Sequence, residues 1–484
     1  MVNCDSGNLT MLTDFYDIAM ANGYLKNGIG DKTAVFDVIF RQIPDHGGFA
    51  IFAGLAQLIE RLSMLRFSPE DISYLRGKQM FSEDFLAYLE HFRFSCDIWS
   101  VEEGTPIFPN EPVIVVKGPL MQAAWLETLI LNTINYQSLI ATKANRIVRA
   151  AQGRRVIEYG ARQAHGSDAA VFGARAAYIG GCSHTSCALA DCKEGVPAEG
   201  FMAHSWVQVF DSEYEAFRKY AETYPDRCIL LVDTYNVLKS GVPNAIRVFD
   251  EVVVPAGFRP LAIRIDSGDI GYLSKRARKM LDEAGYADVQ IIASNSLDEY
   301  IIRDLMLQGA QVDAFTVGEN LITSKSSPVF GAAYILAAVE NDGVLVPKIK
   351  TSESIEKVAT PHFKKLYRLV SNETEMCVAD LVSLYEEEIQ VDKGITIFDP
   401  NATWKKKYLT DVTARSLLVP IFEKGKLVYT SPSLEEIRNY CRNEVEHLWD
   451  EVKRFEFPHR YYVDLSYGLW DIRNMLLADS GINL

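Results

Sequence analysis

Between residues 155 and 318 the chain repeats one pattern, in which a short apolar run is followed by a longer stretch with helical spacing. The apolar runs read VIEYG, CILLVDTY, LAIRIDSGD, QIIASNS and AFTVG, and a typical stretch between them is YLSKRARKMLDEAGY. Strands and helices in such alternation pair in parallel through right-handed crossovers. The pattern therefore predicts an α/β barrel or an open doubly wound sheet.

The residues before this region mix two periodicities. LTDFYDIAMANGYL has the spacing of a helix, whereas TAVFDVIF alternates so that Ala34, Phe36, Val38 and Phe40 share one strand face. A second strand, PIFPNEPVIVVKGPL, is bounded by prolines, and the long apolar helix WLETLILNTINYQSLIATKANRIVRAAQG stops at Gly153. These elements predict an α+β N-terminal domain.

The chain returns to strand-like text after the alternating region. YILAAVENDGVLVPKIKTS contains the turn signal Asp342 and Gly343, which predicts a β-hairpin beside the barrel. The last section holds an acidic helix, SLEEIRNYCRNEVEHLWDEVKRF, and then YYVDLSYGLWDIRNMLL, whose apolar stripe is predicted to pack on the first domain. We therefore predict an α+β domain over residues 1–140, an α/β barrel over 141–350 and a C-terminal segment over 351–484.

Polar residues follow the end of each predicted strand in the alternating region. They are Arg162 after the first strand, Asp233 and Tyr235 after the second, Arg264, Asp266, Ser267 and Asp269 after the third, Ser294 and Asn295 after the fourth, and Gly318 after the last. In a parallel barrel the carboxyl ends of the strands form one face, where active sites lie. Turn formation and helix capping explain Ser267 or Asn295 but not the two arginines. We predict that these segments converge on one pocket.

Composition narrows the classes of function. The net charge of −15 disfavours a general nucleic-acid surface, which needs a basic field to displace counterions. No apolar run approaches the roughly 20 residues that a membrane helix needs, and residues 1–10 carry an acid but no base, unlike a signal peptide. We therefore expect a cytoplasmic protein with no membrane or nucleic-acid partner. The eight cysteines lack paired C-x-x-C spacing, which favours reduced thiols over a zinc site.

Two segments at strand ends are candidates for binding a metal ion or a phosphate. In RIDSGD, Asp266 and Asp269 are hard ligands that suit Mg²⁺ with most of its waters retained, as in sites for phosphate-bearing substrates. A turn with an Asp cap is the alternative. In FTVGEN, backbone N–H groups at Gly318 are expected to hold a phosphate, although the charge of Glu319 opposes an anion.

Cationic and aromatic side chains supply the rest of the predicted pocket. Arg162 and Arg264 carry planar guanidinium groups that suit a carboxylate or a pyrophosphate. Tyr159 is a candidate for stacking on an aromatic base. Tyr16 of the first domain is a second candidate, which would act from a partner subunit if the protein is a dimer.

His204, in the apolar segment EGFMAHSWVQVF, has two interpretations. Most isolated histidines among apolar neighbours are core residues with both ring nitrogens hydrogen-bonded. The alternative is a ring beside Ser205 that faces the phosphate donors and attacks a phosphoryl group in its neutral form. The residues alone favour the core interpretation.

An ordered set of motifs resembles the nicotinate phosphoribosyltransferases: LTDFYDIAMANGY, ATKANRI, EYGARQAHG, GFMAHSWV, RIDSGD, ASNSLDE, FTVGENLIT and EKVATPHFKKLYR. The match runs over nearly the whole chain, which makes it far more specific than any single motif. It implies a type II phosphoribosyltransferase fold, with an α+β N-terminal domain joined by C-terminal helices and an irregular α/β barrel. It also implies a homodimer whose sites lie at the subunit interface.

The resemblance implies that nicotinate and phosphoribosyl pyrophosphate give nicotinate mononucleotide and pyrophosphate, with Mg²⁺ and coupled ATP hydrolysis, in NAD biosynthesis. It implies that ATP phosphorylates His204, which reverses the preference for a core histidine. Arg162 and Arg264 match the arginines that position the pyridine carboxylate and phosphoribosyl groups. Tyr16 and Tyr159 match the stacking tyrosines, and Asp266 matches a ribose or metal contact. The expected catalytic residues are His204, Arg264 and Asp266. The expected substrate-binding set is completed by Ser205, Ser294, Asn295, Gly318 and Glu319.

Four positions depart from the family pattern. Phe201 and Glu319 stand where it has threonine, Cys187 where it has asparagine, and His362 where it has glycine. Because Phe201 and Glu319 are expected near the phosphates, substrate affinity and ATP coupling are the properties they affect. Two alternatives stay open. One is a sister enzyme that uses nicotinamide, and the other is a non-catalytic homologue that binds a nucleotide or a phosphosugar.

Overall fold

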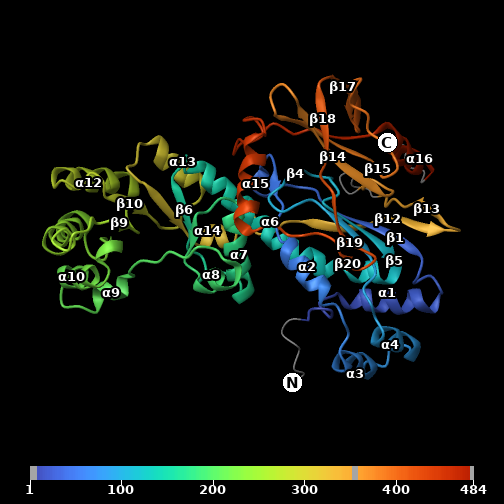
Figure 1. Ribbon diagram of the computed structural model, residues 1–484, viewed down its shortest axis with the longest axis horizontal. Coiled ribbons are helices and arrows are strands. Elements are labelled where there is room, and N and C mark those ends of the chain that lie inside the picture. Colours follow the sequence, from blue (N-terminus) through green and yellow to red (C-terminus); the bar gives the residue numbers. More distant parts are fainter. Residues whose placement is uncertain (1–7, 352–357, 480–484) are drawn as a thin grey trace. The chain divides into compact units, whose positions relative to one another are not determined.

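The computed structural model describes residues 8–351 and 358–479 of the chain. Glu356 and Lys357, which begin the last family motif, lie outside the described residues. The chain divides into two compact units. Unit 1 combines Met1–Leu139 with Val329–Leu484, and unit 2 is Ile140–Pro328, so the two ends of the chain fold together while the middle folds as its own body (Figure 1).

The main sheet of unit 1 has seven strands in the order β13-β12-β1-β5-β3-β19-β20. Their bounds are β1 (Thr33–Phe40), β3 (Asp97–Ser100), β5 (Ile114–Pro119), β12 (Ala332–Asn341), β13 (Val344–Pro347), β19 (Val419–Glu423) and β20 (Lys426–Leu427). β1 pairs antiparallel with both β5 and β12. Both of its faces are covered, because every residue after Thr33 is buried. The predicted face of Ala34, Phe36, Val38 and Phe40 is therefore buried, and so is the opposite face, which includes Asp37.

The predicted hairpin is formed by β12 and β13, which turn at Asp342 and Gly343. It belongs to unit 1, because β12 occupies the edge of β1 from Ala34 to Phe40. The prediction that the barrel domain extends to residue 350 is therefore wrong. β12 satisfies the backbone groups along an edge of β1 that would otherwise be unpaired.

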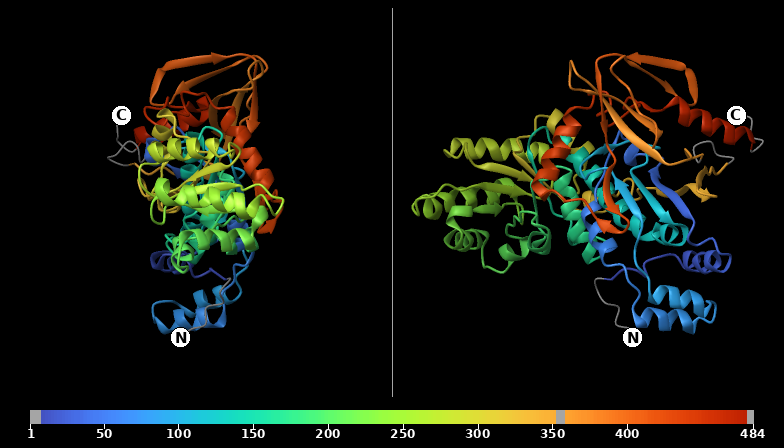
Figure 2. Two further views of the ribbon diagram at one scale, coloured as in Figure 1. Left: turned by 90° about the vertical axis from the view of Figure 1, so that its left-hand side faces the viewer. Right: turned by 45° about the vertical axis from the view of Figure 1, so that its right-hand side comes forward.

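C-terminal elements complete unit 1. A four-stranded sheet, β18-β14-β15-β21, is formed by β14 (Lys364–Ser371), β15 (Cys377–Leu384), β18 (Val412–Ser416) and β21 (Val463–Leu465). Beside it lies the two-stranded ribbon of β16 (Ile395–Asp399) and β17 (Ala402–Leu409), drawn in orange in both views of Figure 2. Because β19 and β20 of this segment extend the main sheet, the predicted joining of the N-terminal domain and the C-terminal segment is confirmed.

Helices cover the sheets of unit 1. They are α1 (Phe15–Lys26), α2 (Leu55–Ser63), α3 (Pro69–Gly77), α4 (Glu83–Glu90), α5 (Leu120–Trp125), the first part of α6 (Glu127–Ala150), α15 (Leu434–Glu446) and α16 (Tyr467–Asp479). Ile18 of α1, Leu75 of α3 and Phe85 of α4 share one apolar cluster with Trp125. None of the helices in the described ranges is both long and apolar enough to cross a membrane.

Unit 2 is built on a parallel sheet of six strands in the order β7-β6-β11-β10-β9-β8. The strands are β6 (Arg155–Glu158), β7 (His184–Thr185), β8 (Ile229–Leu231), β9 (Ala262–Ile265), β10 (Gln290–Ala293) and β11 (Ala314–Val317). Every predicted apolar run of the alternating region is one of these strands, and every pairing between them is parallel. The sheet is a curled half-barrel, which agrees with the predicted irregular α/β barrel.

The strands of unit 2 alternate with helices that bury their apolar faces against the sheet. The helices are α7 (Ser167–Ile179), α8 (Ala188–Glu194), α9 (His204–Gln208), α10 (Glu213–Thr223), α11 (Val242–Val248), α12 (Ile270–Glu283), α13 (Glu299–Leu307) and α14 (Glu319–Ile322). Asp269 and Asp298 cap α12 and α13 by accepting backbone N–H groups of their first turns. The turns between strand and helix therefore fix the direction in which the strand-end side chains leave the sheet.

Candidate active site

A cavity of about 190 Å³ opens at the carboxyl ends of four neighbouring strands of unit 2, β6, β11, β10 and β9. Its lining consists of Tyr159, Arg162, Gln163, Arg264, Asp266, Ser294, Asn295, Ser296, Thr316, Gly318 and Glu319. The structure therefore brings four of the predicted strand-end segments to one pocket. Gln163, Ser296 and Thr316 join the lining although the sequence pattern did not single them out.

The parallel register of the sheet explains why these residues meet. Ala293 of β10 is paired with Ile265 of β9, so Ser294 and Asp266 leave adjacent strands at the same height. In the same way, Val317 is paired with Glu158, and the backbone N–H of Tyr159 donates to the carbonyl of Val317 at 2.8 Å. Side chains that are far apart in sequence thus share one rim of the sheet.

Arg264 lines the cavity, and its guanidinium is hydrogen-bonded to neighbouring side chains. Its Nε donates to Ser294 Oγ at 3.0 Å and its Nη2 to Asp266 Oδ1 at 3.1 Å. The Ser294 hydroxyl also donates to Asp266 Oδ1. Arg264 is only 8% exposed, and such a buried charge is tolerated because the carboxylate and hydroxyl satisfy it. The arginine therefore positions Asp266 and contributes its charge to the floor of the site.

Asp266 also faces His204, the first residue of α9. His204 Nε2 is 3.5 Å from Asp266 Oδ2, and its Nδ1 is 3.2 Å from Thr234 Oγ1. The imidazole side chain is 42% exposed, so the interpretation as a core histidine is wrong. Contacts to the ends of β8 and β9 hold the ring at the strand-end face while solvent reaches it. Ser205 follows on α9 and is exposed.

Asp233 supports this arrangement from the end of β8. Its Oδ2 accepts the backbone N–H of Asp266 at 3.0 Å and the Ser267 hydroxyl at 2.6 Å. Its Oδ1 is buried and has no hydrogen-bond partner among the described residues. The sequence pattern places Asp233 at a strand end but does not reveal that it fixes the neighbouring turn. Thr234 also lies after β8, and the sequence pattern does not reveal that its hydroxyl orients His204.

Aromatic rings form another wall of the site. The ring of Tyr159 lies nearly parallel to that of Phe201, with centroids 6.1 Å apart and an interplanar angle of 13°. The guanidinium carbon of Arg264 is 5.2 Å from the Tyr159 ring centroid. Burial raises the pKa of Tyr159 above its ordinary value, so the phenol stays neutral. Phe201, which departs from the family pattern, therefore supports the tyrosine.

The cavity contains one arginine that is not committed to a protein carboxylate. Arg162 is exposed and forms no ion pair within the described part of the chain, whereas Arg264 is paired with Asp266. Glu319 is partly neutralised, because Lys325 Nζ lies 3.0 Å from its carboxylate. An incoming anion would thus meet Arg162 first, and the repulsion expected from Glu319 is reduced by the lysine.

Four predicted site residues lie outside the cavity lining: His204 and Ser205 of α9, Asp269 and Tyr16. The carboxylate of Asp269 is exposed and caps α12, accepting the N–H of Tyr272 at 2.8 Å. Tyr16 is exposed on α1, which belongs to unit 1. No group of three or more His, Cys, Asp or Glu residues that could hold a metal occurs in the described ranges. An ion near Asp266 and Asp269 would therefore take most of its ligands from substrate and water.

Comparisons with known proteins identify the family. Residues 11–135 match the N-terminal domain of nicotinate phosphoribosyltransferase (NAPRTase), and residues 363–473 match the C-terminal domain of the same enzyme. A nicotinate phosphoribosyltransferase of Bacillus subtilis (strain 168) is 45% identical over 463 residues, which cover 96% of this chain and 94% of that protein. The chain belongs to the nicotinate phosphoribosyltransferase family.

Other members of the nicotinate phosphoribosyltransferase family agree in sequence and in fold. A relative from Mycobacterium tuberculosis (strain ATCC 25618 / H37Rv) is 37% identical over 447 residues, covering 92% of this chain and 89% of that protein. The crystal structure of human nicotinic acid phosphoribosyltransferase is similar with a TM-score of 0.84 at 26% identity, covering 96% of this chain and 99% of that one. The resemblance carried by the motifs is therefore confirmed.

Proposed function

We propose that this protein is a nicotinate phosphoribosyltransferase that converts nicotinate and phosphoribosyl pyrophosphate to nicotinate mononucleotide and pyrophosphate. The observation that carries the proposal is the cavity in unit 2, where the uncommitted Arg162 lies with Tyr159 above the buried Arg264 and Asp266. An aromatic ring beside a free cation suits a flat, aromatic carboxylate. The relatives named above support the same activity.

The chemistry needs few catalytic groups from the protein. The pyridine nitrogen bonds to C1 of the ribose while the bond from C1 to the pyrophosphate oxygen breaks, so positive charge develops at C1 and negative charge on the leaving group. The pyridine nitrogen already has a free lone pair, so no strong general base is required. Positioning and charge neutralisation therefore provide most of the catalysis, and Arg162 and Arg264 supply the cations.

Magnesium is proposed to bind beside Asp266 together with the substrate. The hard carboxylates of Asp266 and Asp269 fit the ligand preference of this ion, and it would neutralise part of the pyrophosphate charge. Asp266 is held in place by Ser294 and Arg264. Asp269 would share its carboxylate between the ion and the α12 cap.

ATP is proposed as a co-substrate that phosphorylates His204. A neutral ring nitrogen would bond to the γ-phosphorus while the bond to the bridging oxygen of ADP breaks. The exposure of the ring and its contacts with Thr234 and Asp266 support this role, because they leave the imidazole oriented and accessible. A phosphoryl group on His204 would add negative charge beside Asp266, and that charge would favour the binding of Mg²⁺ at this face.

We further propose that the protein acts as a cytoplasmic homodimer with composite sites. Tyr16 is exposed on α1 of unit 1 and does not line the cavity of unit 2. Tyr16 of the partner subunit would supply the second aromatic wall for the pyridine ring. This arrangement explains why a large tyrosine remains exposed on a helix whose other side packs into the core.

The activity is tested by chromatographic detection of nicotinate mononucleotide from nicotinate, phosphoribosyl pyrophosphate and Mg²⁺, with and without ATP. We expect product that increases with ATP, and little product when nicotinamide replaces nicotinate. Product from nicotinamide alone would assign the protein to the sister activity. Absence of a mononucleotide from either base would contradict the proposal and favour a binding protein.

A further inference from the structure

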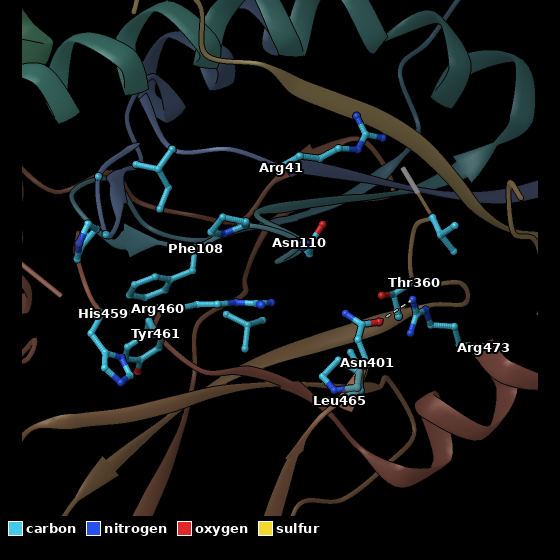
Figure 3. A pocket seen from close by; sticks show the side chains of 18 residues that line it. Arg41, Phe108, Asn110, Thr360, Asn401, His459, Arg460, Tyr461, Leu465 and Arg473 are labelled. Atoms are coloured by element: carbon cyan, nitrogen blue, oxygen red, sulfur yellow. Dashed lines mark hydrogen bonds between the residues drawn. The ribbon is translucent and has the colours of Figure 1, made fainter. Parts of the chain in front are cut away.

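A second cavity, of about 480 Å³, lies wholly within unit 1. It is lined by the segment after β1, the loop before β5, the segment before β14, the turn of the β16–β17 ribbon, β21 with the segment before it, and α16. Its polar lining residues include Arg41, Asn110, Thr360, Asn401, Arg460 and Arg473, and we call it the arginine cavity (Figure 3). It shares no lining residue with the cavity of unit 2.

The arginine cavity is strongly positive in a protein that is acidic overall. Three arginines and His459 line it, and none of its described lining residues is Asp or Glu. The whole chain has a formal charge of −15. A concave site lined by cations and free of carboxylates concentrates positive potential and attracts anions.

Arg473 is the residue that most needs an explanation. It is 7% exposed, and its one described polar contact is a weak hydrogen bond from Nη2 to Asn401 Oδ1 at 3.4 Å. Burial lowers the pKa of its guanidinium, and no carboxylate is near enough to offset that effect. A buried charge with no counterion is costly, and folds retain one chiefly where a ligand supplies the missing charge.

Arg368 shows how the same unit treats an arginine with a structural role. It is fully buried, and its Nη2 is 2.6 Å from Asp380 Oδ2 while its Nη1 is 3.3 Å from Glu444 Oε2. The guanidinium of Arg368 is thus surrounded by carboxylates. Arg473 has none within the described residues, so the two arginines differ in what they are arranged to contact.

Four of the polar side chains of the cavity gather around one space. Figure 3 shows Arg460 and Arg473 reaching toward each other from opposite sides, with Asn401 between them and Thr360 beside Arg473. Arg41 lines a neighbouring wall, and its Nε is buried with no hydrogen-bond partner in the described chain. Two guanidinium forks and an amide side chain can hold a phosphate group by several charge-assisted hydrogen bonds.

We propose that the arginine cavity binds a small phosphate-bearing metabolite, with a phosphate group held between Arg460, Arg473 and Asn401. The volume lies within the range of small-molecule sites and exceeds what a single phosphate requires. Prolines and the stacked rings of Phe108 and Tyr461, 3.9 Å apart, provide apolar walls for the remainder of such a molecule. This site is additional to the one proposed for the reaction.

Calorimetric titration of the full-length protein with inorganic pyrophosphate tests the proposal. The titration is repeated with Arg264→Gln, which disables the anion site of unit 2, and with Arg264→Gln combined with Arg473→Met or Arg460→Gln. Arg264→Gln combined with Arg442→Met is the matched control, because Arg442 is an exposed arginine of the same unit that does not line the cavity.

We expect binding to persist in Arg264→Gln and in the control, and to weaken by about tenfold or more when Arg473 or Arg460 is also replaced. Pyrophosphate should raise the melting temperature of Arg264→Gln and of the control, but not that of the double variants in which Arg473 or Arg460 is replaced. Without pyrophosphate, Arg473→Met should melt no lower than its parent, because it removes a buried charge that lacks a counterion. Complete loss of binding in Arg264→Gln alone, or unchanged binding in both double variants, would overturn the proposal. The exposed Arg460 keeps the test decisive if the Arg473 variant fails to fold.

Discussion

His204 contacts two strand ends through its two ring nitrogens and remains accessible to solvent. If the ring carries a phosphoryl group, His204→Ala should fold normally, because a side chain that is 42% exposed contributes little to the core. The variant should lose stimulation by ATP and retain some ATP-independent transfer. Initial rates of nicotinate mononucleotide formation with and without ATP measure both effects.

A control for this variant is His91→Ala, which removes an exposed histidine of unit 1 whose Nδ1 lies 2.9 Å from the carbonyl oxygen of Ala87. It should keep the ATP response of the wild type. If His204→Ala unfolds the protein, or if it responds to ATP as the wild type does, the phosphohistidine role is wrong.

Glu127 gives a prediction for the dependence of stability on pH. Burial, followed by the nearby charges of Asp17 and Asp14, raises its pKa to about 7. The folded state therefore holds this proton more tightly than the unfolded chain, and the contribution to stability is fully present below the unfolded pKa and is lost as pH rises through about 7. Glu127→Gln should remove this loss, making the variant more stable than the wild type at pH ~8 by about 1 kcal/mol, after allowance for solvent screening of a half-exposed group.

Urea denaturation at a series of pH values between about 5 and 8 measures the effect of Glu127→Gln. The exposed Glu70→Gln of α3 is the control, and its stability should follow that of the wild type throughout. A constant difference between Glu127→Gln and the wild type across the series would show that this carboxyl group does not titrate in that range.

Single residues differ in how well the sequence predicts their surroundings. Arg264, Asp266 and Ser294 could be placed together because each lies at or just after the end of a recognisable parallel strand. Phe201 could not, since its stacking on Tyr159 depends on the path of an irregular segment that has no periodicity. His362 stands where the family has glycine, and its φ of 76° is a left-handed conformation that glycine adopts without strain.

At the scale of elements, an ion pair joins the seven-stranded and the four-stranded sheets of unit 1. Lys364 Nζ of β14 lies 2.5 Å from Asp37 Oδ2 of β1, and both side chains are almost completely buried. Lys364 also donates to the carbonyls of Thr360 and His362. Lys364→Met should destabilise the protein by about 3–5 kcal/mol, because it leaves the Asp37 carboxylate buried without a partner.

Chemical denaturation of Lys364→Met, of its neighbour Lys365→Met and of the double variant Asp37→Asn with Lys364→Met tests this prediction. Lys365 is partly exposed, so its replacement should cost about 1 kcal/mol or less. The double variant should recover much of the lost stability, since no charge remains buried. Equal losses in the single and double variants would show that the charge of Asp37 is not the cause.

The elements themselves were more predictable than their pairing. The apolar runs of unit 2 identified its strands because helices and strands there alternate over short distances. The hairpin of β12 and β13 was also predicted from its turn residues. Its pairing with β1 was not, because those strands are separated by the whole of unit 2 and a strand edge leaves no signal in the local sequence. The same holds for β19 against β3.

For the whole molecule, the proposal of composite sites predicts complementation between two impaired chains. Tyr16→Ala should remove the aromatic wall that one subunit offers to its partner, and Arg264→Ala should disable the cavity of unit 2. A mixed dimer of these chains has one site in which both changes meet and one in which neither occurs. Mixed dimers purified through two different affinity tags should therefore have about half of the wild-type activity, whereas each homodimer should be strongly impaired.

Tyr16→Phe in place of Tyr16→Ala should leave activity nearly unchanged, since the ring is retained. Mixed dimers no more active than the parent homodimers would show that Tyr16 does not complete the site of the partner subunit.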